Sequence, residues 1–207
     1  PEGLETRVVD PAKVAMHFVD LSPEAFATHP DEGRITMGLN VETLSDLISK
    51  ADPEDVITLS YNPETRQLRV EYGSVQANMA LIDPEMIRQE PDVPDLDWAN
   101  EATIATTELA NAVDMADLVA DMASFVCDAD TQGVDVVAEG DVDDVTYVLR
   151  EVDEVDVNAT TRCTYSMDYL NILVDALKGP EVRVSLDDEF PAFFAYTYAD
   201  DAAEVET

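Results

Sequence analysis

The chain has 207 residues, of which 46 are acidic and 11 basic, so its formal net charge is −35. This charge excludes simple electrostatic attraction to phosphate as the main activity of its average surface. However, 46% of the residues are apolar, a fraction typical of globular proteins and above that of a disordered acidic tail. We therefore expect a folded protein with an acidic surface.

The acidic residues are dispersed along the whole sequence, and the only lysines are Lys13, Lys50 and Lys178. Two explanations compete: a mimic of nucleic acid, or a protein from a cell with molar internal salt, where screening over about 3 Å makes self-repulsion tolerable. We favour salt adaptation. No run of 18 apolar residues and no basic-then-apolar leader is present. These features predict a cytoplasmic protein in a high-salt cell, with no membrane partner.

In chain order, strands are predicted first at Leu4–Val9 and Val14–Leu21. One pattern then occurs three times: an amphipathic helix, a strand, a polar turn and a second strand. Successive helices begin about 60 residues apart, a period typical of duplicated modules. The predicted helices and their hairpins are Asn40–Ala51 with Val56–Tyr61 and Gln67–Tyr72, Thr107–Val119 with Ser124–Cys127 and Val134–Ala138, and Met167–Leu177 with Glu181–Ser185 and Phe190–Tyr198.

An acidic segment with three prolines, residues 82–97, predicts an extended connector between two domains. We expect a first domain at 1–83, the connector at 84–98 and a second domain at 99–207. The repeat predicts a helix before Leu4 and a further strand that begins at Ala203–Thr207. We therefore expect a fragment, or a shortened relative, of a protein with four such modules in two domains.

The sequence contains few residue patterns that are typical of catalysis or of metal binding. Cys127 and Cys163 lie in apolar stretches without CxxC spacing, which favours buried free thiols. Residues 128–133 have the spacing of a calcium loop, but their strand-like flanks favour a hairpin turn. Trp98 is interpreted as a core anchor of the second domain. No GxSxG, Walker or GxGxxG pattern occurs. We predict no enzyme, no catalytic residue, no cofactor and no metal site.

Seven sequence blocks carry a family resemblance: Val8–Met16, Met37–Asn40, Asp55–Leu59, Leu81–Asp83, Asp92–Leu96, Ala138–Asp141 and Tyr169–Asn171. They resemble the archaeal and eukaryotic proliferating cell nuclear antigen (PCNA) family of DNA sliding clamps, most closely that of salt-loving archaea. The resemblance implies an α+β DNA clamp fold of two similar domains, with helices lining one face of antiparallel sheets. It also implies a homotrimeric ring that encircles duplex DNA and tethers DNA polymerase, the clamp loader and other peptide-motif proteins without catalysis.

The resemblance also implies three sets of site residues. A pocket beneath the connector would bind partner peptides through Val9, Lys13, Val14, Val93, Pro94 and Pro191. Neighbouring subunits would join by edge-strand pairing of 75–81 with 142–150, through Val75, Ala77, Met79, Val145, Tyr147 and Arg150. The DNA-facing helices would carry Lys50, Asn111 and Lys178.

On those helices, the positions that usually carry lysine or arginine in the family hold Asp46, Asn111, Asp114, Asp168 and Asp175. We therefore expect weak direct contact with duplex DNA. One alternative is a clamp-derived adaptor or inhibitor that binds clamp partners as a monomer and closes no ring. An acidic DNA mimic is the third hypothesis; it would bind basic proteins with strong salt dependence.

Overall fold

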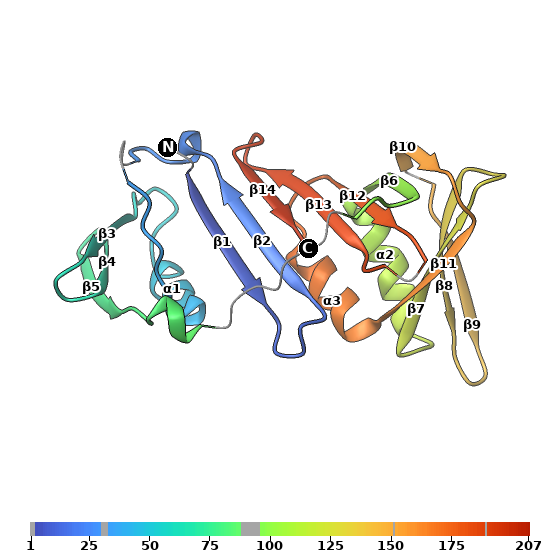
Figure 1. Ribbon diagram of the computed structural model, residues 1–207, viewed down its shortest axis with the longest axis horizontal. Coiled ribbons are helices and arrows are strands. Elements are labelled where there is room, and N and C mark those ends of the chain that lie inside the picture. The colour runs from blue at the N-terminus through green and yellow to red at the C-terminus, as the bar shows by residue number, and fades with distance from the viewer. Residues whose placement is uncertain (1–2, 30–32, 88–95, 151, 189) are drawn as a thin grey trace. The chain divides into compact units, whose positions relative to one another are not determined.

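The computed structural model describes every residue except 1–2, 30–32, 88–95, 151 and 189 (Figure 1). Within it the chain forms two compact units, residues 32–89 and residues 1–31 together with 90–207. Each unit has its own sheet and its own buried core.

The smaller unit contains one α-helix and a three-stranded antiparallel sheet with the order β3-β4-β5. Asn40 caps the helix, because its side chain accepts a hydrogen bond from the Thr43 amide at 2.9 Å. Period-2 alternation along β4 buries Leu68, Val70 and Tyr72 against the helix side. The elements are α1 (Val41–Ile48), β3 (Thr58–Asn62), β4 (Gln67–Tyr72), β5 (Val75–Ala80) and the short 3-10 helix η2 (Pro84–Met86).

The larger unit contains a seven-stranded and a four-stranded antiparallel sheet, with α2 (Thr106–Asp117) and α3 (Met167–Ala176) packed side by side. The seven-stranded sheet has the order β1 (Leu4–Val9), β2 (Met16–Leu21), β14 (Ala203–Glu206), β13 (Phe193–Tyr198), β12 (Glu181–Leu186), β6 (Asn100–Ala105) and β10 (Val152–Val157). The four-stranded sheet has the order β11 (Thr161–Ser166), β7 (Met122–Asp128), β8 (Gly133–Glu139) and β9 (Asp144–Val148). A 3-10 helix, η1 (Pro23–Ala25), follows β2.

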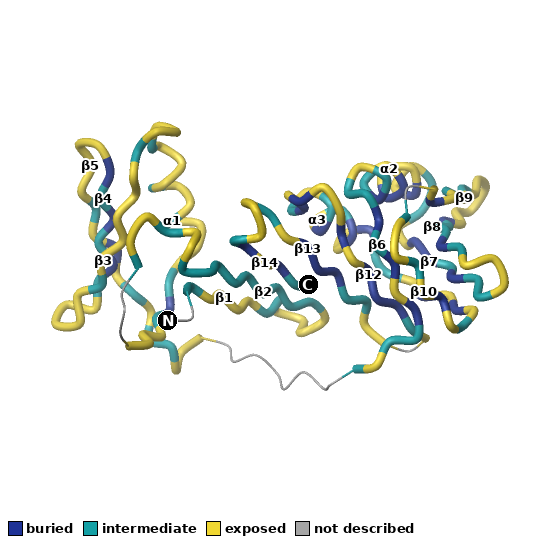
Figure 2. Tube along the Cα trace, turned by 90° about the horizontal axis from the view of Figure 1, so that it is seen from above, coloured by how far each residue is buried: buried dark blue, intermediate teal, exposed yellow. Residues whose placement is uncertain are grey.

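The main core lies between the two helices and the inner faces of these sheets (Figure 2). Phe125 of β7, Ile104 of β6 and Leu109 of α2 are fully buried there. Tyr196 of β13 donates a hydrogen bond from its hydroxyl to the Ala176 carbonyl at 3.0 Å, which ties the seven-stranded sheet to the end of α3. One face of this sheet therefore carries the helices, and the opposite face, called here the outer face, does not.

The predicted helix-and-hairpin modules are confirmed: α1 with β3 and β4, α2 with β7 and β8, and α3 with β12 and β13. The last strand was predicted too early, because β13 begins at Phe193 and not at Phe190. The strand predicted to begin at Ala203 is β14. Three strands of the larger unit, β6, β10 and β11, were not predicted.

The compact units divide the chain differently from the domain limits predicted above, which assigned residues 1–83 to one domain. Strand β2 pairs with β14 along four residue pairs, from Ala203 with Leu21 to Glu206 with Phe18. This pairing places β1 and β2 in the same sheet as the C-terminal strands. Backbone hydrogen bonding therefore joins residues 1–31 to 90–207.

Candidate partner-binding face and subunit edges

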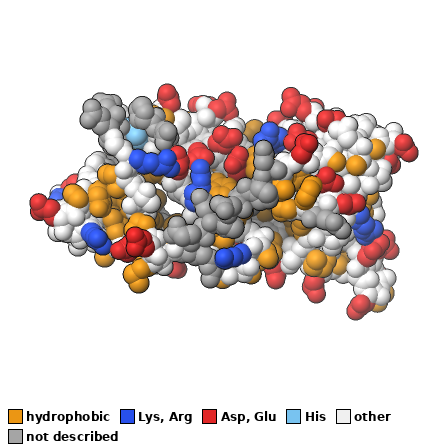
Figure 3. Space-filling model, in the orientation of Figure 1, with side chains coloured by type: hydrophobic (Ala, Val, Ile, Leu, Met, Phe, Trp, Pro, Cys, Tyr) orange, Lys and Arg blue, Asp and Glu red, His pale blue; other side chains and the backbone are white. Residues whose placement is uncertain are grey.

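Apolar side chains of β1, β2 and β13, called here the apolar row, lie on the outer face of the seven-stranded sheet, where the β14 strand between β2 and β13 carries Glu204 and Glu206. Val9 pairs with Met16, and the strand registers place Phe193 of β13 on the same face as Met16. Trp98 lies against Phe193 with ring centroids 5.2 Å apart, and its Nε1 donates to the Pro191 carbonyl at 3.0 Å. Figure 3 views the molecule in the orientation of Figure 1 and shows hydrophobic side chains between charged ones on this side.

Trp98 thus has a different place from the predicted one. It is half-buried and does not belong to the main core. Its ring packs against Phe193 on the outer face, and its indole N–H donates a hydrogen bond to the Pro191 carbonyl. An aromatic ring with one polar edge suits this boundary position.

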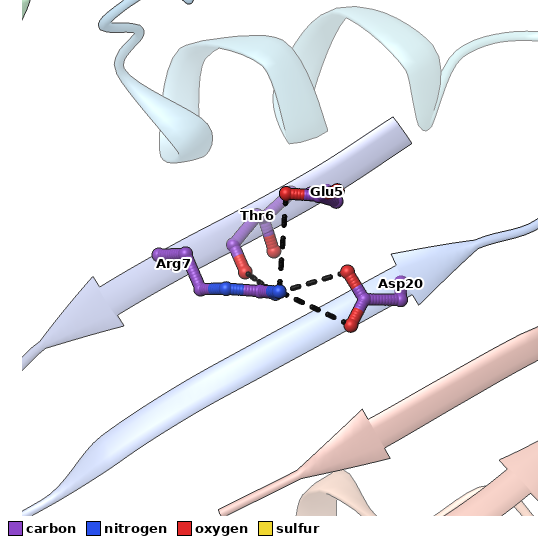
Figure 4. Close-up of polar contacts among 4 residues, drawn as sticks. All are labelled: Glu5, Thr6, Arg7 and Asp20. Atoms are coloured by element: carbon purple, nitrogen blue, oxygen red, sulfur yellow. Dashed lines mark hydrogen bonds and ion pairs between the residues drawn. The ribbon is translucent and has the colours of Figure 1, made fainter. Parts of the chain in front are cut away.

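Charged residues also lie on the outer face, and Figure 4 shows Arg7 of β1 pointing toward Asp20 of β2 with Glu5 beside it. Arg7 of β1 donates to both carboxylate oxygens of Asp20 on β2, at 3.0 and 3.2 Å, and lies 3.9 Å from Glu5. Its guanidinium also lies 5.0 Å from the centre of the Phe18 ring. On the other side of the row, the Arg183 guanidinium lies 5.7 Å from the Phe193 ring centre. Both guanidinium groups are therefore stacked on aromatic rings of this face.

The loop between β1 and β2 is organised by one carboxylate. Asp10 accepts hydrogen bonds from the backbone amides of Ala12 at 2.9 Å, Val14 at 2.7 Å and Ala15 at 3.0 Å. The hydroxyl of Tyr169, on α3, donates to the same carboxylate at 3.1 Å. Lys13 has a φ of 60°, in the left-handed region that favours glycine. The carboxylate therefore holds a loop conformation that the sequence alone does not favour.

These donors also control the charge of Asp10. The Ala15 amide, aided by those of Ala12 and Val14 and by the Tyr169 hydroxyl, lowers the pKa of Asp10 to about 2 against an opposing desolvation effect. Asp10 is therefore ionised at any pH at which the protein would act. The pKa of Tyr169 is raised by desolvation and by its bond to Asp10, so its hydroxyl keeps the proton that it donates.

The structure describes four of the six predicted pocket residues. Val9 ends β1, Lys13 and Val14 lie in the exposed β1–β2 loop, and Pro191 precedes β13; all four belong to the larger unit. Val93 and Pro94 lie outside the described residues. The prediction missed Asp10 and Tyr169, which stand 159 positions apart in the sequence and meet only in the fold.

Both strands predicted to join subunits are edge strands of their sheets. Among the strands that the structure describes, β5 pairs only with β4, and β9 pairs only with β8. Val75, Ala77 and Met79 share the core face of β5, opposite Tyr72, Val70 and Leu68. Val145 and Tyr147 share the core face of β9, opposite Ala138 and Val136. Each edge therefore offers unpaired backbone groups together with an apolar side-chain face.

Arg150, the last predicted interface residue, borders a groove between α2 and β9. Its amide donates to Glu108 Oε1 of α2 at 3.0 Å. Glu108, Thr146, Tyr147, Val148 and Arg150 line this groove. The side chain of Arg150 is exposed beside the free edge of the sheet.

The residues predicted to face DNA are exposed on or just after helices. Lys50 follows α1, Asn111 lies on α2, and Lys178 follows α3 with its Nζ 3.4 Å from the Asp175 carbonyl. Asn171 of α3 donates to Asp117 of α2 at 3.1 Å, which links the two helices across their exposed side. In the larger unit, α2 carries Glu108, Asp114 and Asp117, and α3 carries Asp168 and Asp175, so carboxylates predominate on these two helices.

Other predicted features have structural roles in the described residues. Cys127 and Cys163 are buried thiols, and burial raises the pKa of Cys127 to about 11. Asp128 accepts from the amide of Asp130 at 2.9 Å, which confirms the hairpin turn between β7 and β8. Among the described residues, no three His, Cys, Asp or Glu side chains are grouped to hold a metal ion. None of the described helices is long and apolar enough to cross a membrane.

Comparison with known proteins agrees with the fold. The family model described as proliferating cell nuclear antigen, N-terminal domain, matches residues 1–93. A DNA polymerase sliding clamp of Natronomonas pharaonis is 38% identical over 96% of this chain and 81% of its own length. One of Haloarcula marismortui is 35% identical over 99% of this chain and 83% of its own. A solved structure of the C-terminal region of FEN-1 bound to A. fulgidus PCNA matches 99% of this chain and 83% of that one, with TM-score 0.89 and 30% identity.

The repeated helix-and-hairpin modules over antiparallel sheets are therefore those of the DNA clamp fold. The chain belongs to the proliferating cell nuclear antigen family of DNA polymerase sliding clamps.

Proposed function

We propose that this chain is a non-catalytic processivity clamp, which closes a homotrimeric ring around duplex DNA and recruits replication and repair proteins. One observation supports the proposed ring. The contact proposed between β5 and β9 of neighbouring copies has an equivalent inside the chain, because β14 pairs with β2 there. β14 follows a module helix and hairpin as β5 does, and β2 ends a hairpin as β9 does. A head-to-tail contact of β5 with β9 would repeat this pairing between copies and can close by rotation.

The internal pairing gives a register for the proposed subunit contact. In each hairpin we take the residue pair nearest the turn as the reference. The pair of Tyr198 with Ala203 in β13 and β14 then corresponds to Tyr72 with Val75 in β4 and β5. The pair of Val9 with Met16 in β1 and β2 corresponds to Glu139 with Asp144 in β8 and β9. Val205 opposite Val19 then corresponds to Ala77 opposite Tyr147. By the same shift Val75 would face Leu149, and Met79 would face Val145. The core faces of both edge strands meet in this register, so apolar side chains would be buried together.

The register is tested by a disulfide between copies. In the variant with Ala77→Cys and Tyr147→Cys, the two positions would be directly opposite, where Cα atoms of antiparallel strands lie about 4.5–5.5 Å apart and suit a disulfide. Oxidation in about 2 M KCl, where charges are screened within about 3 Å, should give covalent species up to the trimer on a non-reducing gel. Light scattering should give three times the 22.7 kDa of one chain.

The matched control is Asn78→Cys with Tyr147→Cys, because Asn78 is the next residue on β5 and faces the opposite side of the sheet. It should give little cross-linked product. Equal cross-linking of both pairs would contradict the register, and a monomer in light scattering with the fold intact would overturn the ring. A monomer that still bound partner peptides would instead be the adaptor.

We propose further that partner peptides bind on the outer face, at Val9, Lys13, Val14 and Pro191, with Val93 and Pro94 of the connector. The domain limits 1–83, 84–98 and 99–207 belong to this proposal. The support is the apolar row beside an organised loop, and the relative from A. fulgidus whose solved structure holds the C-terminal region of FEN-1. Pockets that are already ordered bind short peptides at lower entropic cost.

The proposed contact with DNA is topological and weak. Lys50, Asn111 and Lys178 would face the duplex among many carboxylates, and encirclement does not require tight phosphate contacts. The −35 charge and the similarity to haloarchaeal clamps support action in a salt-rich archaeal cytoplasm.

A further inference from the structure

An exposed apolar side chain is usually mobile, but the loop between β1 and β2 holds one in a fixed backbone. Val14 is 66% exposed, yet its amide makes the shortest of the hydrogen bonds to Asp10, at 2.7 Å. The Asp10 amide donates to the Ala15 carbonyl, and the Lys13 amide donates to the Asp10 carbonyl, both at 3.0 Å. Backbone hydrogen bonds, and not side-chain packing, therefore fix the position of Val14.

The loop is also connected to a distant helix. Tyr169 lies in the first turn of α3, and its hydroxyl reaches Asp10 Oδ2, the oxygen that also accepts from Ala12. The other oxygen, Oδ1, serves Val14 and Ala15. The four donors thus divide between the two oxygens, and Tyr169 adds an anchor from outside the loop. The carboxylate is solvent-accessible, so water competes for the same positions when a donor is removed.

We infer that Asp10 and Tyr169 form a positioning pair, which holds Lys13 and Val14 in the conformation that binds a partner peptide. This inference rests on the proposed peptide-binding function. Lys13, with its left-handed φ of 60°, would leave this conformation for a large part of the time if the carboxylate lost its anchor. A loop that is binding-competent for only part of the time binds with an affinity reduced by that fraction.

The first test measures binding of a labelled C-terminal peptide of A. fulgidus FEN-1 to the full chain by fluorescence anisotropy. Tyr169→Phe removes one hydrogen bond to a charged group and keeps the ring. We expect affinity about threefold to tenfold weaker, the range of an ordinary hydrogen bond, because water replaces part of the lost bond at this accessible carboxylate. The matched control is Tyr61→Phe, which also removes one hydroxyl but lies in the smaller unit, and it should bind as the unmodified chain does.

A second readout separates positioning from general stability. Asp10→Ala releases three backbone amides and should weaken binding more than Tyr169→Phe does. Adding Tyr169→Phe to Asp10→Ala should then cost nothing further, because the hydroxyl has lost its acceptor. All measurements are made well below the unfolding temperature, where a small loss of stability leaves the folded fraction unchanged.

The outcomes distinguish the two proposals. If the unmodified chain does not bind the peptide, the proposed peptide-binding function fails and the positioning role falls with it. If the unmodified chain binds and Tyr169→Phe binds equally well, only the positioning role is overturned. Additive losses in the double variant would also overturn it, because they would show that the two residues act separately.

Discussion

Asp10 shows how one ionised side chain can order an exposed loop through hydrogen bonds, without a hydrophobic core beneath the loop. Its carboxylate accepts from three backbone amides and one tyrosine hydroxyl, so four of the hydrogen bonds that order the loop end on the same charge. The backbone amides of Ala15, Ala12 and Val14 and the Tyr169 hydroxyl lower the pKa of Asp10.

The loop should therefore lose its order in acid. The pKa of Asp10 is about 2 in the folded chain and ordinarily 3.8, so the carboxylate favours folding above the ordinary value. That contribution should be full above about pH 5 and should fall away between about pH 4 and 2. Urea unfolding of the unmodified chain and of Asp10→Ala measures it as a difference in free energy of unfolding. A difference that stays constant across this range would contradict the assignment.

Among the elements, the small unit has the thinner core. Leu68, Val70, Tyr72 and Met79 are its buried apolar residues, whereas the larger unit buries residues from two helices and two sheets. The Tyr72 hydroxyl donates to the Leu47 carbonyl at 2.6 Å, which fastens β4 to α1. The stability of this unit thus depends on very few side chains.

Leu68→Ala tests that dependence. Replacing a buried leucine by alanine costs about 2–5 kcal/mol, which is a large part of the stability of a small unit. We expect amides of β4 and β5 to lose hydrogen-exchange protection while those of β7 and β8 keep theirs. The control is Leu118→Ala, since Leu118 is 75% exposed and should leave both sets unchanged. Uniform loss of protection would mean that the two units unfold together.

The exposed sides of α2 and α3 should limit contact with DNA. Asp114→Lys with Asp175→Lys should strengthen binding to a short linear duplex and steepen its logarithmic salt dependence by about 2 if both lysines contact phosphate. Asp130→Lys with Asp141→Lys makes the same change of net charge in turns of the four-stranded sheet. Equal effects of the two pairs would point to net charge and not to the helix surface.

The spacing at which apolar residues recur explains which helices and strands could be predicted from the sequence. Helices α1, α2 and α3 and their hairpins have clear periods and polar turns, so their ends were predicted to within a few residues. Strand β10 carries a bulge between Asp153 and Asp156, which breaks its alternation, and β11 alternates polar residues with Thr, Cys and Tyr. The pocket residues came from family resemblance. The bond between Asp10 and Tyr169 has no local signal, because the two residues are brought together only by the complete sheet.

At the scale of the whole molecule, the net charge of −35 sets the conditions for folding. The chain has few basic residues that can form ion pairs. The ion pairs that the structure describes lie mostly between exposed side chains. Such pairs contribute little. Screening by dissolved salt must therefore offset most of the repulsion between carboxylates.

The unfolding midpoint should accordingly fall when KCl is lowered from about 1 M to 0.1 M, because the screening length grows from about 3 to 10 Å. Thermal unfolding at a fixed pH measures this. Sucrose at matched viscosity controls for general solvent effects. A midpoint that does not fall at low salt would refute the salt-adapted reading of the composition.

The pairing of β2 with β14 also has a consequence in time. Leu21 emerges from the ribosome long before its partner Ala203 is made. At about 5–20 residues per second, the β1–β2 hairpin waits about 10–40 s with one edge open. Residues 32–89 close their own sheet from nearby strands in that interval. Until β14 is made, the open edge of β2 must therefore be kept from pairing with other chains.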